Sequence, residues 1–458
     1  MNLGKARTGR RILTVGTVAV VTTTLLLTGC TSGGNGNAQG PSDEVTSFDW
    51  KNFEGTQLNV MLSQHPLATA IEKKLPEFEK LTGIKVKTES LSETDYFTKL
   101  LAELQSKSGN YDAFMTGATV NWQYASAGWS EDLQPWIDNP KATSPDWNVD
   151  DFYPSTLDML KWDKTNFGGL GKGSQWSIPA NQEGYALFYR KDILDAAGIQ
   201  VPSTIDELIA AAKKLNGTEF DGKKINGFVA RGDKTWPTLL PFASFLKTYG
   251  GADVVDGKSG ADSPEAVEAV TKWVELMQYA PKAASTFTWY EAQQDFLAGN
   301  TAFYLDADHM AEAFEADGSA IKGKVGYALP PEGPDGRKSG MWLWSLGMNA
   351  ASSHKDAAWL FIQWATSSEF LTAAIAEHNI NPPRKSAAQS AEMAEMTKEW
   401  GDYNEIWQQI LSDYAEWPYS PSASWTELGD TWATGIQSAV IGEKSVEDAM
   451  KDTAKKID

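Results

Sequence analysis

The 458-residue sequence predicts an α/β fold in which mostly parallel sheets are flanked by helices. Short apolar or alternating segments predict strands at 58–62, 84–88 and 112–115. Between the first two, apolar residues recur every three or four positions from Leu67 to Leu81, which predicts a helix that Pro76 kinks or splits. Strands that alternate with helices at this spacing are typical of a parallel sheet built from βαβ units.

Polar and aromatic residues follow two of these predicted strands. Gln64 and His65 come directly after the first strand, and Trp122 lies in the segment after the third, which we expect to be a loop. Because ligands in open α/β sheets bind beyond the carboxyl ends of the strands, we expect these residues at the mouth of a site. A lone histidine is usually structural, which leaves that alternative open for His65.

The first 29 residues predict a secretory signal peptide. A basic start with Lys5 and three arginines precedes an apolar run from Ile12 to Leu27, which is shorter than the roughly 20 residues of a membrane span. The motif that ends at Cys30 resembles a bacterial lipobox, which implies cleavage before Cys30 and lipid on its sulfur. Cys30 is the only cysteine and has no disulfide partner, which favours lipidation over an uncleaved anchor or an ordinary cleavage beside an incidental cysteine.

Residues 30–50 are expected to form a flexible tether, because most of them are glycine, serine, asparagine or other polar residues. The full chain has 40 basic and 60 acidic side chains, and loss of the signal peptide leaves 36 basic side chains and a net charge of −24. A chain this acidic is a poor candidate for nucleic-acid binding. Anionic lipid would also repel it, so acyl chains on Cys30 would be needed to hold it at the membrane.

The stretch 176–208 has a specific order of elements. A polar, turn-prone segment at 181–184 is followed by an aromatic strand at 185–189, a helix, a proline and a second helix. Thr204 and Glu207 form a predicted capping box at the start of that second helix. This order resembles the crossing between the two lobes of extracellular solute-binding protein family 1, the carbohydrate-binding, maltose-binding-protein-like receptors of bacterial ABC importers.

Further segments resemble the same family over nearly the whole chain after the signal peptide. They lie at 128–136, 296–306, 325–330, 345–349, 381–385 and 445–451. The resemblance implies a two-lobe, periplasmic-binding-protein-like fold of type II, with a hinge of about three crossings near residues 184, 345 and 384. It implies that residues 51–185 and 345–384 form lobe 1, and that residues 186–344 and 385–458 form lobe 2.

Motifs for catalysis, metals or cofactors are not found in the sequence. The four histidines never fall at the spacing of an HExxH zinc motif, and Cys30 is already assigned to lipidation. The glycine-rich segment 168–173 lacks the flanking strand and helix of a phosphate-binding loop, so we expect a surface loop there. Carboxylates are so numerous that a pair spaced for glycoside hydrolysis carries meaning only with a measured separation.

The 19 tryptophans are the positive indication of a ligand. A flat indole matches the C–H face of a sugar ring, and polar side chains match its hydroxyl rim. The alternative is that tryptophan is core, which we expect for the helical Trp273, Trp359 and Trp364. The candidate ligand-binding residues are Gln64, His65, Trp122, Glu183, Trp236, Asp306, Trp342, Trp344, Arg384 and Trp425. We expect only one of Trp342 and Trp344 to face the cleft, and for Arg384 an interlobe salt bridge is the alternative.

The sequence thus predicts a monomeric, lipid-anchored, extracytoplasmic substrate-binding receptor of an ABC importer. It would bind a sugar, oligosaccharide or polyol between its lobes, close by a hinge motion and dock on the membrane permease. No enzymatic activity, metal or cofactor is expected. Two alternatives stay open, a secreted carbohydrate-active enzyme and a receptor for another solute such as peptide, polyamine or iron.

Overall fold

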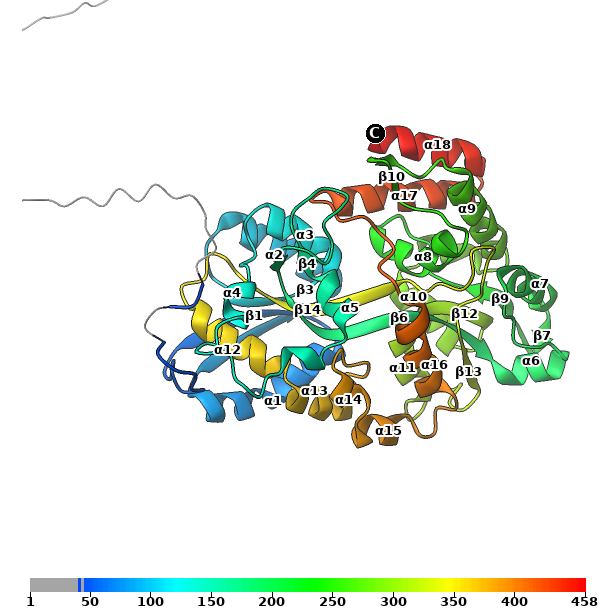
Figure 1. Cartoon of the computed structure of the whole chain (residues 1–458). Helices are drawn as coiled ribbons and strands as arrows, with labels where there is room; N and C mark the ends of the chain where they lie inside the picture. The colour runs from blue at the N-terminus through cyan, green and yellow to red at the C-terminus, as the bar shows by residue number, and fades with distance from the viewer. Residues whose placement is uncertain (1–39, 43–44) are drawn as a thin grey trace, which may run out of the picture. The chain divides into compact units, whose positions relative to one another are not determined.

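The computed structural model describes residues 40–42 and 45–458 (Figure 1). The predicted signal peptide, Cys30 and most of the predicted tether lie outside the described residues. At the end of the predicted tether, Val45 is buried and the Phe48 and Trp50 rings meet at 5.2 Å and pack on the core, so residues 45–50 do not form part of a flexible tether. Over the described part of the chain, no helix is both long and apolar enough to cross a membrane.

The centre of the fold is an eight-stranded mixed sheet, which confirms the predicted α/β class. Its order is β2-β1-β3-β14-β6-β12-β9, and β13 also pairs with β6. These strands span Gln57–Ser63 (β1), Lys85–Leu91 (β2), Ala113–Gly117 (β3), Ile178–Arg190 (β6), Asn226–Val229 (β9), Thr301–Ala307 (β12), Val325–Ala328 (β13) and Met341–Met348 (β14). Strand β1 is parallel to β2 and β3, and β12 is parallel to β9, whereas β6 and β14 run antiparallel to their neighbours, so the sheet is mixed and not mostly parallel as the sequence predicts.

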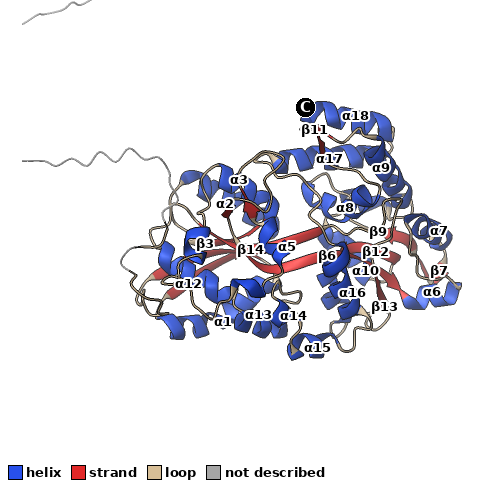
Figure 2. Cartoon of the chain, in the orientation of Figure 1, coloured by secondary structure: helices blue, strands red, loops and turns tan. Residues whose placement is uncertain are grey.

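Helices cover the sheet above and below in the view of Figure 2. Those before β14 are α1 (Pro66–Thr82), α2 (Glu93–Ser106), α3 (Ala118–Ser126), α4 (Gln134–Ile137), α5 (Pro154–Met159), α6 (Lys191–Ala197), α7 (Ile205–Leu215), α8 (Leu239–Thr248), α9 (Pro264–Met277), α10 (Trp289–Leu297) and α11 (Ala311–Glu315). Those after β14 are α12 (Lys355–Ala365), α13 (Ser368–Ala374), α14 (Lys385–Ala388), α15 (Ala391–Thr397), α16 (Tyr403–Gln409), α17 (Trp425–Val440) and α18 (Val446–Ile457). Three two-stranded ribbons pair β4 (Lys161–Trp162) with β5 (Ser174–Gln175), β7 (Glu219–Phe220) with β8 (Lys223–Lys224), and β10 (Val254–Val255) with β11 (Lys258–Ser259).

Local sequence signals set the ends of the helices near the sheet. Helix α1 begins with a proline at its first position and ends at Gly83, whose φ of 74° suits glycine. It runs through Pro76 without interruption, so the expected split does not occur. The predicted capping box of Thr204 and Glu207 is confirmed at the start of α7. Trp122 lies within α3 and not in a loop.

Strand β6 replaces the turn that the sequence predicts at 181–184. It is a single strand of 13 residues, and all but one of its residues are buried. The turn prediction is wrong because the polar side chains find partners across the fold: Asn181 donates to the carbonyl of Ile380 at 2.6 Å, and Gln182 donates to that of Pro382 at 3.1 Å. A buried polar strand is stable when its side chains are hydrogen-bonded in this way.

Three chain segments lie side by side at the middle of the sheet. The first half of β6 pairs with β14, and the second half pairs with β12 and β13. The segment 379–382 is hydrogen-bonded along β6 at residues 181 and 182. In Figure 1, β1 and β3 lie on one side of this crossing region, and β9, β12 and β13 lie on the other. The exact lobe boundaries stay a prediction.

Candidate functional site

A cavity of about 200 Å³ opens next to the crossing strands. Its wall combines residues that follow β1, β9 and β12 with residues of β6 and β14 and of the first turns of α2 and α10. Six of the ten predicted ligand-binding residues line it, namely Gln64, His65, Glu183, Trp236, Trp342 and Trp344. The other four, Trp122, Asp306, Arg384 and Trp425, do not line it.

Four tryptophans line the cavity, and the rings of three of them, Trp236, Trp342 and Trp344, pack together as its aromatic wall. Trp342 and Trp344 both line it, so the prediction that only one of them faces the cleft is wrong: residues two apart on a strand share a face. Their ring centroids lie 5.7 Å apart at 87°, and the Trp236 ring lies 5.2 Å from that of Trp342. Gly117 makes room for this wall, because a Cβ atom there would lie 2.1 Å from the Trp342 ring.

Trp122 and Trp425 support this wall from behind. The Trp425 ring meets the Trp236 ring at 5.4 Å and 74°, and the Trp122 ring meets that of Trp425 at 6.4 Å. Both side chains are buried among protein atoms. Trp425 therefore packs against Trp236 from outside the cavity, and Trp122 packs on Trp425 in turn.

Asp306 contacts Arg231 and not the cavity. Arg231 does line the cavity, and its guanidinium donates to both Asp306 carboxylate oxygens, with the closest contact from Nη2 to Oδ1 at 2.5 Å. Asp306 is fully buried and the Arg231 side chain is 5 % exposed. Such a bidentate pair fixes the guanidinium at the edge of the cavity.

Arg384 is a structural residue in this fold. Its side chain is fully buried, its guanidinium carbon lies 3.8 Å from the centre of the Phe152 ring, and it donates to the carbonyls of Thr366 and Asn148. It also pairs with Asp151 at 3.4 Å. The structure therefore shows Arg384 in a buried salt bridge and away from the cavity, but its partner Asp151 belongs to the same predicted lobe, so the bridge is not the expected interlobe one.

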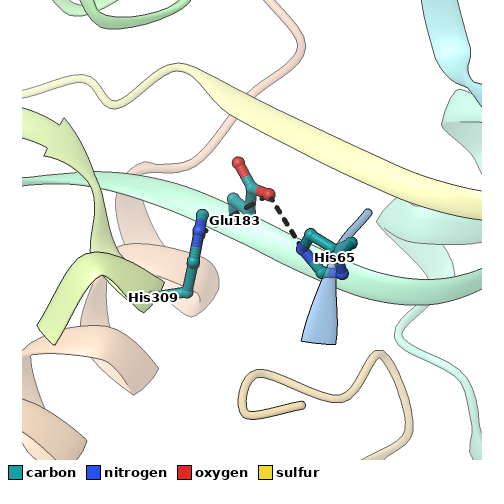
Figure 3. Close-up of side chains that lie close together, drawn as sticks. All are labelled: His65, Glu183 and His309. Atoms are coloured by element: carbon teal, nitrogen blue, oxygen red, sulfur yellow. Dashed lines mark ion pairs between the residues drawn. The ribbon is translucent and has the colours of Figure 1, made fainter. Parts of the chain in front are cut away.

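The polar end of the cavity holds His65, Glu183 and His309 (Figure 3). His65 Nε2 lies 3.9 Å and His309 Nδ1 lies 3.5 Å from Glu183 Oε1, and Figure 3 shows the two rings on either side of the carboxyl group. Glu183 stands directly opposite Trp342 in the register of β6 and β14, which places both side chains on one face. His65 is also the N-cap of α1, because its Nδ1 accepts from the backbone N–H of Leu67 at 3.1 Å.

Burial controls the charge of these three groups. Desolvation raises the pKa of Glu183 to about 8, against a smaller opposing effect of Arg231. Desolvation lowers the pKa of His309 to about 4, and it lowers the pKa of His65 well below 6.5, with a further contribution from His309. Near pH 7 both histidines are neutral and the Glu183 carboxyl is largely protonated.

These three side chains have the composition of a metal site, since their possible ligand atoms all lie within 4.8 Å of one another. The tautomer of His65 argues against that role. A histidine that ligates a metal donates its other ring N–H, whereas Nδ1 of His65 accepts a hydrogen bond. Its Nε2 therefore carries the proton and points a donor, not a lone pair, at Glu183.

We expect Glu183→Gln to flatten the pH dependence of stability above pH 6.5. The pKa of Glu183 is about 8 in the folded protein and near 4.5 when exposed, so between these values the folded state binds more protons and the free energy of unfolding falls as the pH rises. The histidines, whose pKa values are lowered, act in the opposite direction only below about pH 6.5. Between pH 6.5 and 8, the free energy of unfolding measured in urea should fall by roughly 1–2 kcal/mol more in the wild type than in Glu183→Gln. Parallel curves for the two proteins would contradict the raised pKa.

Four residues that shape the cavity are not among the ten candidate ligand-binding residues, although Trp289 is one of the tryptophans that the sequence places in loops and favours for the site. Arg231 follows β9 and His309 follows β12, so the same strand-end rule that selects Gln64 would have found both. Glu93 and Trp289 begin helices α2 and α10 and meet each other, the indole N–H donating to the carboxylate at 3.2 Å. No local pattern in the sequence brings those two helix ends together.

Comparisons with known proteins agree with this architecture. The family model for bacterial extracellular solute-binding proteins matches residues 63–370. The erythritol/L-threitol-binding protein of Mycolicibacterium smegmatis is 32 % identical over 91 % of this chain and 89 % of its own length. A solute-binding protein of an ABC transporter from Agrobacterium radiobacter K84, solved in complex with ribitol, superimposes with a TM-score of 0.76 at 26 % identity, over 88 % of this chain and 98 % of that one.

A maltose-bound protein of T. maritima is similarly close, with a TM-score of 0.75 at 25 % identity, over 88 % of this chain and 99 % of that one. These matches confirm the predicted two-lobe, type II periplasmic-binding-protein-like fold. The family model covers more than half of the chain, and the Mycolicibacterium relative matches it almost end to end. The chain therefore belongs to the family of bacterial extracellular solute-binding proteins.

Proposed function

We propose that this protein captures a small polyol or sugar in the tryptophan-lined cavity and delivers it to the membrane permease of an ABC importer. The observation that carries the proposal is one cavity in which a wall of three packed indole rings stands next to ring nitrogens that lack hydrogen-bond partners among the described residues. Indole faces match C–H surfaces, and unpaired donors and acceptors match hydroxyl groups. The named ligands of the relatives, erythritol, L-threitol and ribitol, have this chemistry.

The size of the cavity supports a short ligand. Its volume of about 200 Å³ lies below the roughly 300–1,000 Å³ of pockets that hold drug-sized molecules. A four- or five-carbon polyol or a monosaccharide suits this volume better than an oligosaccharide.

A thermal-shift screen over erythritol, L-threitol, ribitol, D-mannitol and maltose tests the proposal. A ligand present at 100 times its Kd stabilises the folded state by about 2.7 kcal/mol, which gives a readily measured rise in melting temperature. We expect at least one polyol or monosaccharide to produce this rise at a lower concentration than maltose does. No shift with any polyol or sugar would contradict the proposal.

Glycoside hydrolysis is the alternative from another class, and it needs one protonated and one ionised carboxyl group. Glu93 and Glu183 both line the cavity, but burial raises the pKa of both carboxyl groups, which disfavours the ionised partner. We favour binding without turnover, since the chain belongs to a family of solute-binding proteins. Incubation with oligosaccharides and an assay for new reducing ends separates the two. Steady release that Glu183→Gln abolishes would establish an enzyme.

Closure of the two lobes around the ligand is part of the proposal. The three neighbouring segments near residues 184, 345 and 384 would act as the hinge, and the lobes would rotate as rigid bodies within a monomer. Ligand is then expected to reduce the radius of gyration in solution scattering while the helix content stays unchanged. Identical scattering curves with and without a bound ligand would count against hinge closure.

Membrane attachment through Cys30 completes the proposed function. A lipid on Cys30 would hold the acidic protein on the outer face of the cell membrane, close to the permease. We expect Cys30→Ser to release the protein from the membrane fraction or to leave the signal peptide uncleaved. An intact mass that shows an unmodified N-terminus beyond Cys30 would refute the anchor.

A further inference from the structure

Two buried ring nitrogens at the polar end of the cavity lack hydrogen-bond partners among the described residues, namely His65 Nε2 and His309 Nδ1. Both point at Glu183 Oε1, but at 3.9 and 3.5 Å they are too far away for good direct hydrogen bonds. The side chains of His65 and Glu183 are 9 % and 5 % exposed, so bulk water is largely kept from them. Buried polar atoms without partners are rare and costly, which indicates that something binds between them.

The hydrogen-bonding role of His65 is fixed by the fold. The backbone N–H of Leu67 donates to Nδ1, so Nε2 carries the proton and is a donor. The cap of α1 and the neighbouring Trp344 ring, 5.4 Å away, hold the imidazole in this orientation. An acceptor must therefore stand in front of Nε2.

We propose that His65, Glu183 and His309 form a subsite for one hydroxyl group of the ligand, with the His65 Nε2–H as donor to its oxygen. A hydroxyl both accepts and donates, so the same group can accept from His65 and donate to Glu183 or His309. An oxygen about 2.8 Å from each of two atoms that are 3.9 Å apart satisfies both at normal hydrogen-bond distance. This inference rests on the proposed function and deepens it, because it names the ligand group and the atoms that bind it.

The electrostatics of the subsite agree with an uncharged group. Burial lowers the pKa of both histidines and raises that of Glu183, so the three side chains are essentially neutral near pH 7. An ammonium or carboxylate group of a ligand would find no fixed opposite charge among these three. A ligand that lacks the hydroxyl would leave the buried groups unpaired, which is the arrangement that gives strong discrimination against deoxy analogues.

Calorimetric titration of matched ligands and variants tests the subsite. The probes are the tightest binder among erythritol, ribitol and D-mannitol, together with each of its mono-deoxy analogues; for erythritol these are butane-1,2,3-triol and butane-1,2,4-triol. His65→Asn keeps an N-cap residue but removes the long-reaching donor, and His309→Leu removes the second ring. His378→Asn is the control, since His378 is exposed and has a φ of 65° that asparagine tolerates.

We expect the wild type and the control to prefer the parent polyol over one deoxy analogue by tenfold or more, and this preference to fall below about threefold in His65→Asn. If the melting temperature of His65→Asn is well below that of the wild type, the preference for the parent polyol over its deoxy analogue is compared between the wild type and His309→Leu instead. An unchanged preference in the folded histidine variants would overturn the subsite while leaving the proposed function intact. Failure of the wild type to bind any of the three polyols would overturn the proposed function, and the subsite with it.

Discussion

Asp306→Asn is expected to lower the free energy of unfolding by about 3–5 kcal/mol, the usual cost of removing one partner from a buried ion pair. The substitution leaves the Arg231 guanidinium, only 5 % exposed, without its bidentate carboxylate. Urea unfolding at pH 7 measures the loss. Because Arg231 lines the cavity, polyol affinity should fall as well.

Asp317→Asn is the matched control for this prediction. Asp317 pairs with Lys322 at 2.7 Å, but its side chain is fully exposed, so solvent screens the pair and its loss should cost far less stability than loss of the buried pair. Combining Arg231→Met with Asp306→Leu should recover much of the stability, since neither half of this ion pair is then left buried without its partner. Equal losses for Asp306→Asn and Asp317→Asn would show that the buried pair does not hold this side of the cavity together.

Trp344→Ala and Trp236→Ala are expected to weaken polyol binding by tenfold or more. Each removes an aromatic wall of the cavity, and truncation of a buried interface aromatic commonly costs more than about 1 kcal/mol, or about 2 or more at a hot spot. Trp342→Ala should have a similar effect, because its ring joins the other two. Calorimetry gives the affinities, and melting without ligand gives the stabilities.

The stability comparison separates a binding wall from core. Phe78→Ala removes a fully buried ring that packs on Phe361 and Trp364, and it should lower the melting temperature far more than the cavity variants do. Trp425→Ala removes a ring behind the wall and should also act mainly on stability. Cavity variants as unstable as Phe78→Ala would make these tryptophans structural, and stable variants with normal affinity would refute the aromatic-cleft argument.

The parts of the fold that depend on local pattern could be predicted from the sequence. The predicted strands at 58–62 and 112–115 correspond to β1 and β3 within one or two residues, and the Thr204 capping box is present. Predictions failed where contacts with residues far away in the sequence determine the local structure. The sequence around Asn181 and Gln182 predicts a turn, but their side chains form hydrogen bonds with the segment 379–382, and both residues lie in β6.

The site was predictable to the extent that strand ends and residue types define it. Gln64, His65 and Trp236 follow strands and do line the cavity. Asp306 and Arg384 were equally plausible by type, yet Arg231 and Asp151 pair with them inside the protein, and a sequence does not reveal such pairs. The error at Trp342 and Trp344 came from misapplying the alternation rule, which places two residues separated by one position on the same face and not on opposite faces.

A crystal structure of the protein with the polyol that binds most tightly is the most direct test of the central claim. We expect one ligand molecule in the cavity, with its carbon chain against Trp236, Trp342 and Trp344 and one of its hydroxyl groups within hydrogen-bond distance of His65 Nε2. A well-ordered ligand bound elsewhere on the molecule, or one in the cavity with no hydroxyl near His65 and Glu183, would contradict it.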